Sequence, residues 1–154
     1  DMACSYPCLM DAKSVYILNK EYLYHYRPVE TSMTRAYKPD FFEKSFILYK
    51  ELEAQIIKRE MLSFMLQVKA NLCFLGVLAI ENEFDRPRPK NSRRRIDSIR
   101  KIAYNEEMAD ALREAVFEKC RPKYRLYLKL LQWKRIYLLY LLSYLVKIIR
   151  KIRP

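Results

Sequence analysis

Residues 61–80 read MLSFMLQVKANLCFLGVLAI, a long and mainly apolar stretch. Twenty residues of helix are long enough to cross a bilayer. Gln67, Lys69 and Asn71 lie at its centre, however, and a central lysine costs about 2.5–3.5 kcal/mol on insertion scales. The stretch therefore predicts a buried helix of a helical bundle. A membrane-spanning helix, paired with part of residues 130–150, is the alternative.

The composition predicts a mainly α fold. The chain has 154 residues, of which 51% are hydrophobic and one is glycine. This apolar content excludes a disordered chain, and the lack of glycine excludes collagen and most sharply turned β architectures. Glycine-rich phosphate cradles are excluded for the same reason. Helix is therefore the expected secondary structure for most of the chain.

Cysteine and histidine are too scattered to predict a metal site. Cys4 and Cys8 form one near pair, Cys73 and Cys120 lie far from it, and His25 is the sole histidine. A chain of this size can build a core without disulfides. We therefore expect free thiols and a reducing, cytoplasmic compartment.

Further helices are predicted on both sides of the apolar stretch. Apolar residues recur at helical spacing over 40–58, where Asp40 begins a capping box. A short helix is predicted over 93–102, and a third over 105–121 with Asn105 as its cap. These helices would surround the apolar stretch in a bundle.

The net charge of +12 is concentrated at the carboxy-terminal end. Residues 1–118 hold 19 basic and 18 acidic side chains, and the remaining residues hold eleven basic and no acidic ones. This excess indicates an anionic partner for the last quarter of the chain.

A single amphipathic helix is predicted over 124–152, which contains neither Gly nor Pro. One side of its helical wheel carries Arg125, Lys129, Gln132, Ser143, Lys147 and Arg150. The other side carries Tyr127, Leu131, Leu138, Leu142, Leu145 and Ile149. Such a helix is typical of the bilayer interface, with its basic side against anionic lipid. The residues expected to bind the membrane are Lys129, Trp133, Lys134, Arg135, Lys147, Arg150 and Lys151.

Two other interpretations of these basic segments are open. The apolar side of the carboxy-terminal helix could pack on the preceding helices and leave the charges solvated. The tail and the run Arg93-Arg94-Arg95 could instead bind nucleic acid. This partner is disfavoured because the tail is rich in Leu and Ile, and because Asp97 places the arginines in a solvated helix start.

The amino-terminal segment predicts a β-hairpin. Residues 14–18 are a β-branched and aromatic run, Asn19 and Lys20 form a polar turn, and residues 21–27 alternate in polarity up to Pro28. Two strands alone are marginally stable in water. The hairpin should therefore lean on the helices or on a sheet outside this chain.

This segment resembles the end of the catalytic domain of bacterial family 2 glycosyltransferases, which have a GT-A fold. Residues 22–27, YLYHYR, resemble the family's aromatic strand ending in Tyr-Arg, and residues 32–34, SMT, resemble the Ser-hydrophobic-Ser/Thr element after it. Residues 1–7 look like the helix that follows the family's Glu-Asp motif, and residues 12–17 look like the next strand. The basic helical tail is similar to extensions of capsule and exopolysaccharide transferases.

The resemblance implies a chain of three parts. Residues 1–37 would end a catalytic domain, residues 38–121 would be a helical extension, and residues 122–154 would be the basic membrane-associating helix. The family's Asp-x-Asp motif, which holds Mg²⁺ or Mn²⁺ with the sugar nucleotide, and its catalytic base would lie before Asp1. This chain is therefore expected to hold no cofactor and to be inactive alone.

The resemblance also implies substrate contacts. Arg27 would pair with a phosphate of a nucleotide-sugar donor or a lipid-linked acceptor, because its planar fork suits phosphate oxygens. Ser32 and Thr34 would donate hydrogen bonds beside it, and His25 could approach a metal or a leaving phosphate. A structural ion pair at Arg27 and a packed His25 are the alternatives.

The implied function is sugar transfer from a nucleotide-sugar donor to a lipid-linked glycan, at the cytosolic face of the plasma membrane. A non-enzymatic helical module that binds nucleic acid or a membrane surface is the alternative.

Overall fold

The computed structural model describes residues 2–14, 16, 37–84, 91–115, 117 and 120–152. Within these residues the fold is all-helical, which confirms the mainly α prediction. The elements are α1 (Met2–Asp11), α2 (Phe41–Lys58), the 3₁₀ turn η1 (Leu62–Phe64), α3 (Met65–Asn82), α4 (Ser92–Ala103), α5 (Glu106–Glu114), α6 (Pro122–Gln132) and α7 (Ile136–Ile152).

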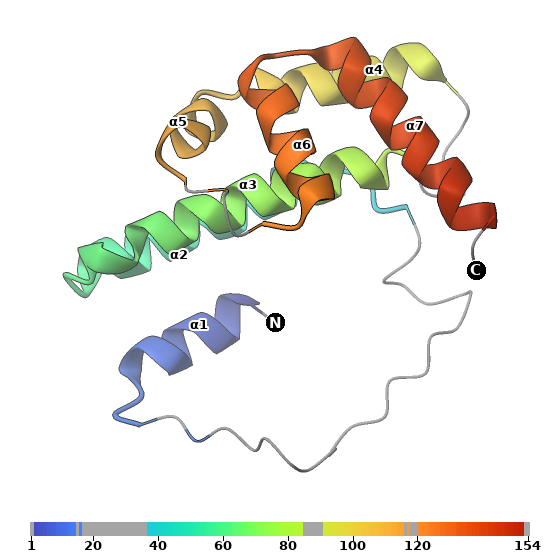
Figure 1. The fold of residues 1–154 in the computed structure, drawn as a ribbon. Helices are drawn as coiled ribbons and strands as arrows, with labels where there is room; N and C mark the ends of the chain where they lie inside the picture. Colours follow the sequence, from blue (N-terminus) through green and yellow to red (C-terminus); the bar gives the residue numbers. More distant parts are fainter. Residues whose placement is uncertain are drawn as a thin grey trace.

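Helix α3 is the centre of the bundle. It packs against α2, α4, α5 and α6, and Figure 1 shows α4 to α7 on one side of the α2–α3 pair and α1 on the other. Residues 62–82 are long and apolar enough to span a bilayer, with a mean hydropathy of 1.6. Here Leu72, Val77 and Ile80 are buried in the core, and the Lys69 ammonium lies 2.6 Å from a Glu114 carboxylate oxygen. The predicted bundle helix is therefore observed.

The start of α2 differs from its prediction. Asp40 adopts a left-handed conformation with φ 54° and makes no side-chain capping bond. The predicted capping box is therefore wrong, because an N-cap side chain reaches its helix from an extended backbone. The Asn105 cap is confirmed, since its side-chain oxygen accepts the backbone N–H of Met108 at 2.8 Å.

Helix α5 is shorter than predicted. It ends at Glu114, and Ala115 has an extended backbone with φ −72° and ψ 137°. Met108, Ala111 and Leu112 are buried against the core as their spacing indicates. The chain then starts a new helix at Pro122, where the fixed φ of proline is favourable and its missing N–H costs nothing.

The predicted single helix over 124–152 is wrong, because the chain divides it into α6 and α7. Lys134 adopts φ 52°, its N–H donates to the Leu131 carbonyl at 2.9 Å, and the Arg135 N–H donates to the Leu130 carbonyl at 2.9 Å. This is a Schellman ending with a lysine in the position usually held by glycine. The turn lets both helices contact the core, in which Tyr127 of α6 and Leu139 of α7 are fully buried.

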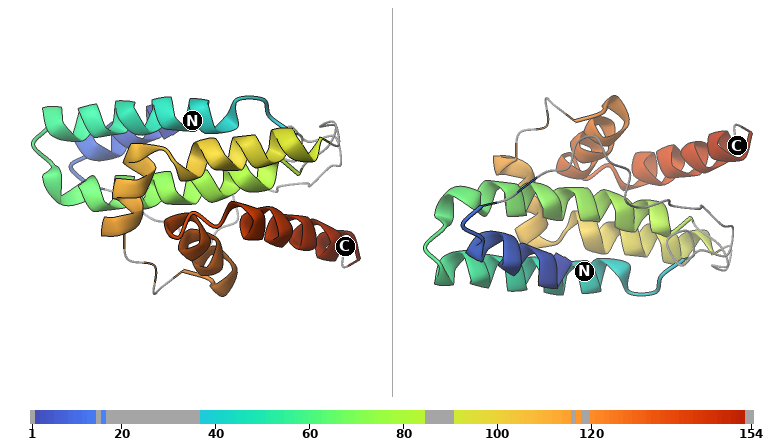
Figure 2. Two further views of the ribbon diagram at one scale, coloured as in Figure 1. Left: turned by 90° about the horizontal axis from the view of Figure 1, so that it is seen from above. Right: turned by 90° about the horizontal axis from the view of Figure 1, so that it is seen from below.

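The predicted hairpin lies almost entirely outside the described residues. Of residues 14–27 the structure describes positions 14 and 16, and neither is in a strand. The amino-terminal helix is present as α1, and the Arg59 guanidinium joins it to α2 through Asp11, with Nε 2.7 Å from the carboxylate. Figure 2 shows α1 running beside α2.

Candidate functional site

Helix α7 exposes an apolar face. The large side chains on it that are at least one third exposed are Tyr137, Leu138, Leu141, Tyr144, Leu145, Ile148 and Ile149. At about 100° per residue these seven positions fill an arc of about 140°. We call this set the α7 face. A contiguous exposed apolar surface on a folded protein marks a site of interaction.

The opposite side of α7 faces the core. Leu139 is fully buried and Ser143 is 3% exposed, although the predicted helical wheel placed Ser143 on the solvated side. The Tyr127 hydroxyl donates to Ser143 Oγ at 3.0 Å, and Ser143 Oγ donates to the Leu139 carbonyl at 2.8 Å. Because the hydroxyl of Ser143 is satisfied inside the bundle, Leu138, Leu141 and Leu145 on the other side of α7 are exposed.

The predicted apolar side of the wheel is therefore divided between two environments. Tyr127 and Leu131 of α6 are buried, as expected for a bundle helix. Leu138, Leu145 and Ile149 of α7 are each about half exposed, as expected for a surface that meets a partner. The break at residues 133–135 separates these two roles.

Three of the predicted membrane-binding residues, Trp133, Lys134 and Arg135, form the turn that precedes α7. Trp133 is 60% exposed, and Lys129, Lys134 and Arg135 are also exposed. The Lys134 ammonium lies 4.6 Å from the centre of the Tyr104 ring, which holds it at the α6–α7 turn. Lys147 is half-buried. Arg150 and Lys151 belong to the last turn of α7, and their side chains lie outside the described part.

The fold adds a second basic group that sequence spacing did not connect with the first. Helices α4 and α7 pack side by side, and Ser92 Oγ lies 3.1 Å from the Tyr140 hydroxyl. Arg93 and Arg94 follow Ser92 in the first turn of α4, and both are exposed. The Asp97 carboxylate forms an ion pair with the Arg100 guanidinium, with 2.9 Å between nitrogen and oxygen.

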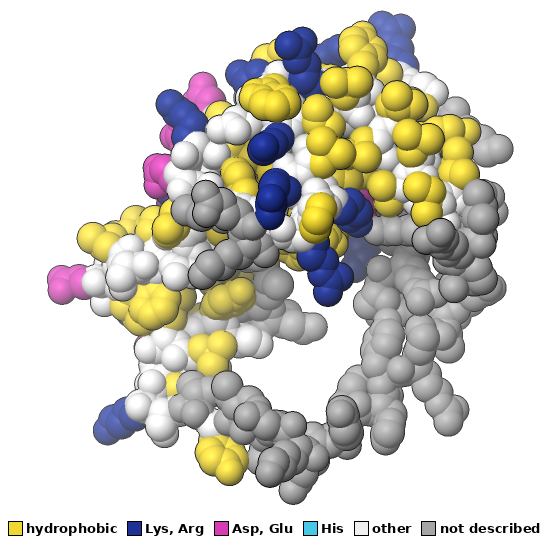
Figure 3. All heavy atoms as spheres, viewed as in Figure 1, with side chains coloured by type: hydrophobic (Ala, Val, Ile, Leu, Met, Phe, Trp, Pro, Cys, Tyr) yellow, Lys and Arg dark blue, Asp and Glu magenta, His cyan; other side chains and the backbone are white. Residues whose placement is uncertain are grey.

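Arg95 stabilises the same junction through its ring contact. Its guanidinium lies 5.0 Å from the centre of the Phe84 ring, and that ring lies 5.4 Å from the Tyr140 ring. Figure 3 shows the apolar surface over α7 with Lys and Arg side chains on its border, whereas acidic side chains are visible mainly on the left of the view. The α7 face is thus an apolar surface with a basic rim.

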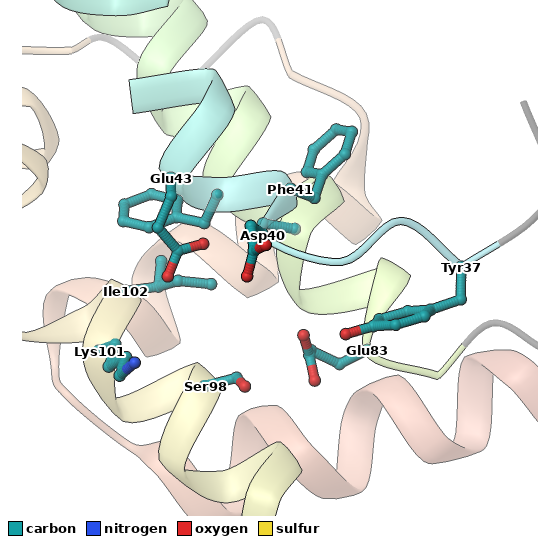
Figure 4. A pocket seen from close by; sticks show the side chains of 10 residues that line it. Tyr37, Asp40, Phe41, Glu43, Glu83, Ser98, Lys101 and Ile102 are labelled. Atoms are coloured by element: carbon teal, nitrogen blue, oxygen red, sulfur yellow. The ribbon is translucent and has the colours of Figure 1, made fainter. Parts of the chain in front are cut away.

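A separate pocket of about 180 Å³ lies between α2, α3 and α4. Figure 4 shows Asp40, Glu43, Glu83 and Ser98 pointing into a common space, with Lys101 at its edge. Burial raises the pKa of Glu83 to about 7, although a hydrogen bond with Ser98 and the charge of Arg95 act in the opposite direction. This carboxyl therefore exchanges its proton near neutral pH. Among the described residues, no group of three or more His, Cys, Asp or Glu is arranged to hold a metal ion.

The predicted substrate-binding residues, Arg27, Ser32, Thr34 and His25, lie outside the described residues. Sequence reasoning missed Leu141, Tyr144 and Ile148 as members of the α7 face. Their spacing of 3 and 4 residues was a signal that could have found them. The packing of the start of α4 on α7, where Ser92 contacts Tyr140, is a tertiary contact that has no sequence signal.

Comparison of the chain with known protein families, with curated proteins and with solved structures gives no match. The function must therefore be inferred from the surface and its chemistry.

Proposed function

We propose that the chain binds an anionic membrane surface through the α7 face. The observation that carries this proposal is the arc of seven large, exposed apolar side chains on one helix with lysine and arginine on its border. An interfacial helix buries its apolar side at the boundary of headgroups and acyl chains, and its basic side contacts anionic headgroups. Each basic residue near such a surface contributes roughly 1 kcal/mol.

The charge distribution favours lipid over a second copy of this chain as the occupant of the α7 face. After Glu118 the sequence holds eleven basic and no acidic residues. A symmetric dimer through α7 would bring the same positive groups of both copies together, and such like-charge contacts oppose association. An anionic bilayer neutralises these groups and covers the apolar side chains at the same time.

Vesicle co-sedimentation of the full chain tests the proposal. The wild type should sediment with vesicles that contain phosphatidylglycerol and much less with pure phosphatidylcholine. The double variant Leu141→Glu/Leu145→Glu should bind at least about tenfold more weakly, a loss of about 1.4 kcal/mol or more. Ile47→Glu is the matched control, because Ile47 is an equally large apolar residue, 69% exposed on α2 and away from α7. Equal binding by the two variants would remove the α7 face from the site.

The basic rim is tested separately. Arg93→Gln/Arg94→Gln should weaken binding to anionic vesicles by about tenfold or more, and the loss should shrink at high salt, where charges are screened. A nucleic-acid site would instead bind nucleic acid without needing the apolar side chains of the α7 face. Binding to duplex or single-stranded nucleic acid that is unaffected by Leu141→Glu/Leu145→Glu would favour that alternative.

The resemblance of residues 1–37 to family 2 glycosyltransferases suggests a role for this membrane contact. We propose that the helical bundle is the extension of such an enzyme and holds it at the cytosolic membrane face. There a soluble nucleotide-sugar donor meets a lipid-linked acceptor, and Arg27, Ser32, Thr34 and His25 would border the substrate. A Mg²⁺ or Mn²⁺ ion would belong to the catalytic part of the intact enzyme.

The DNA sequence upstream of the Asp1 codon tests the proposal that the bundle is the extension of a glycosyltransferase. Asp-x-Asp and Glu-Asp codons in frame would support it, and Arg27→Ala in the intact enzyme should then weaken donor or acceptor binding. A start codon directly upstream would contradict the enzymatic role and leave the membrane contact unaffected.

A further inference from the structure

A second concave site lies on the bundle, between α3 and α6. It has a volume of about 390 Å³, which falls within the range of about 300–1,000 Å³ typical of small-molecule sites. Its walls are apolar: Phe74 and Val77 come from α3, and Tyr124 and Leu128 come from α6. We call it the α3–α6 pocket.

The contacts around the α3–α6 pocket hold its walls in place. The rings of Phe74 and Tyr124 lie 5.3 Å apart. The Lys123 ammonium lies 4.6 Å from the centre of the Tyr124 ring and 2.6 Å from a Glu81 carboxylate oxygen on α3. The Arg125 guanidinium donates to the Cys120 carbonyl at 3.4 Å. The pocket is therefore formed before any ligand arrives, which lowers the cost of binding.

The formal charge on the described residues that line the pocket is of one sign. Among the described residues that line it, Arg121 is the one with a formal charge, and its side chain is exposed. No described lining residue is a carboxylate. A ligand that fits therefore has an apolar body for the walls and an anionic group for the guanidinium, which forms paired hydrogen bonds with carboxylate or phosphate oxygens.

We propose that the α3–α6 pocket binds a single-chain anionic amphiphile, such as a fatty acid or an alkyl phosphate. The hydrocarbon chain lies against Phe74, Val77 and Leu128, and the head group pairs with Arg121. This site is distinct from the α7 face, and its occupancy does not depend on membrane binding.

Cys120 provides a reporter for this site, because it lines the pocket and is partly exposed. Cys73 is buried, and burial raises the pKa of its thiol to about 12, so it forms little thiolate and should not react. In the full chain carrying Cys4→Ser/Cys8→Ser, alkylation should therefore report on Cys120. Dodecyl phosphate, below the concentration at which it forms micelles, should slow this alkylation at least about fivefold at saturation, because the bound chain covers the sulfur.

Three controls make the experiment decisive. Dodecyltrimethylammonium, which has the same chain and the opposite charge, should give little protection. Arg121→Gln should weaken the protection by dodecyl phosphate by about tenfold, the loss of about 1.4 kcal/mol from one charged contact. The reactivity of Cys73 should stay low throughout, which shows that the amphiphile has not unfolded the bundle.

The outcomes separate two sources of the ligand. Protection by free dodecyl phosphate alone assigns a soluble amphiphile to the pocket, and protection by phosphatidylglycerol vesicles as well assigns a lipid from the bilayer. No protection of Cys120 by dodecyl phosphate or laurate would overturn the proposal, as would equal protection by the cationic amphiphile. These results leave binding through the α7 face untouched, which Leu141→Glu/Leu145→Glu tests on its own.

Discussion

Glu83 should make the stability of the bundle depend on pH. The residue is 8% exposed, and burial raises the pKa of its carboxyl from the usual 4.5 to about 7. A carboxyl whose pKa is higher in the folded than in the unfolded protein binds more protons when folded. The free energy of unfolding should therefore fall as pH rises from about 4.5 to about 7, and stay level above that.

Replacing Glu83 with Gln removes this dependence. Raising the pKa of this carboxyl from 4.5 to about 7 corresponds to about 3 kcal/mol at 1.36 kcal/mol per unit. The carboxyl lines a pocket that is open to solvent, which screens the charge, so we expect Glu83→Gln to stabilise the protein by about 1–2 kcal/mol at pH 8. Near pH 4.5 the variant and the wild type should be nearly equally stable.

Urea unfolding followed by far-ultraviolet circular dichroism measures the free energy of unfolding of each variant and its change with pH. Glu51→Gln, which removes an exposed carboxyl of α2, is the matched control and should leave the pH profile unchanged. A Glu83→Gln variant that is less stable than wild type at pH 8 would refute the argument. A pH profile with the same slope as wild type would refute it as well, because another group would then be responsible.

Four further substitutions test the packing by urea unfolding. Glu60→Gly should stabilise by about 1 kcal/mol, because Glu60 holds φ 57° at the end of α2, where glycine has no steric penalty; a loss of stability would contradict the left-handed backbone. Ser143→Ala should cost about 1–2 kcal/mol, because the buried Tyr127 hydroxyl loses its acceptor at 3.0 Å; an unchanged midpoint would show that this bond contributes nothing. Gly76→Val should cost about 1–3 kcal/mol, because a β-carbon there lies 2.4 Å from the terminal methyl of buried Met108. Met108→Ala in the same chain should bring the total loss below the sum of the two single losses, and full additivity of the two effects would contradict the contact.

Most of the helices could be predicted from the sequence because their signals are local. Apolar spacing indicated α2 and α4, a continuous apolar stretch indicated α3, and the Asn105 cap is a bond between near neighbours in the chain. The break between α6 and α7 carries no such signal. Its left-handed residue is Lys134 rather than glycine, and the gain that offsets the strain is tertiary, since the turn lets Leu139 reach the core.

The composition of the last segment pointed to the candidate site, but the orientation of α7 could not be predicted from the sequence. Lys129, Trp133, Lys134 and Arg135 are exposed, and their role at a membrane stays a prediction. The helical wheel, however, was continued through the break at residues 133–135, which gave α7 the wrong phase and turned Ser143 outward. The correct phase depends on the Tyr127 hydroxyl, which is brought to Ser143 by the packing of α6 on α7.

The most direct test of membrane binding is to place a fluorescent probe on the α7 face. Leu141→Trp in a Trp133→Phe chain leaves one indole, and Ile47→Trp in the same background is the control on α2. With phosphatidylglycerol vesicles that carry brominated acyl chains, the indole introduced at position 141 should be strongly quenched and the one at position 47 should not. An unquenched indole at position 141 in protein that sediments with the vesicles would contradict the account, because another surface would then hold the membrane.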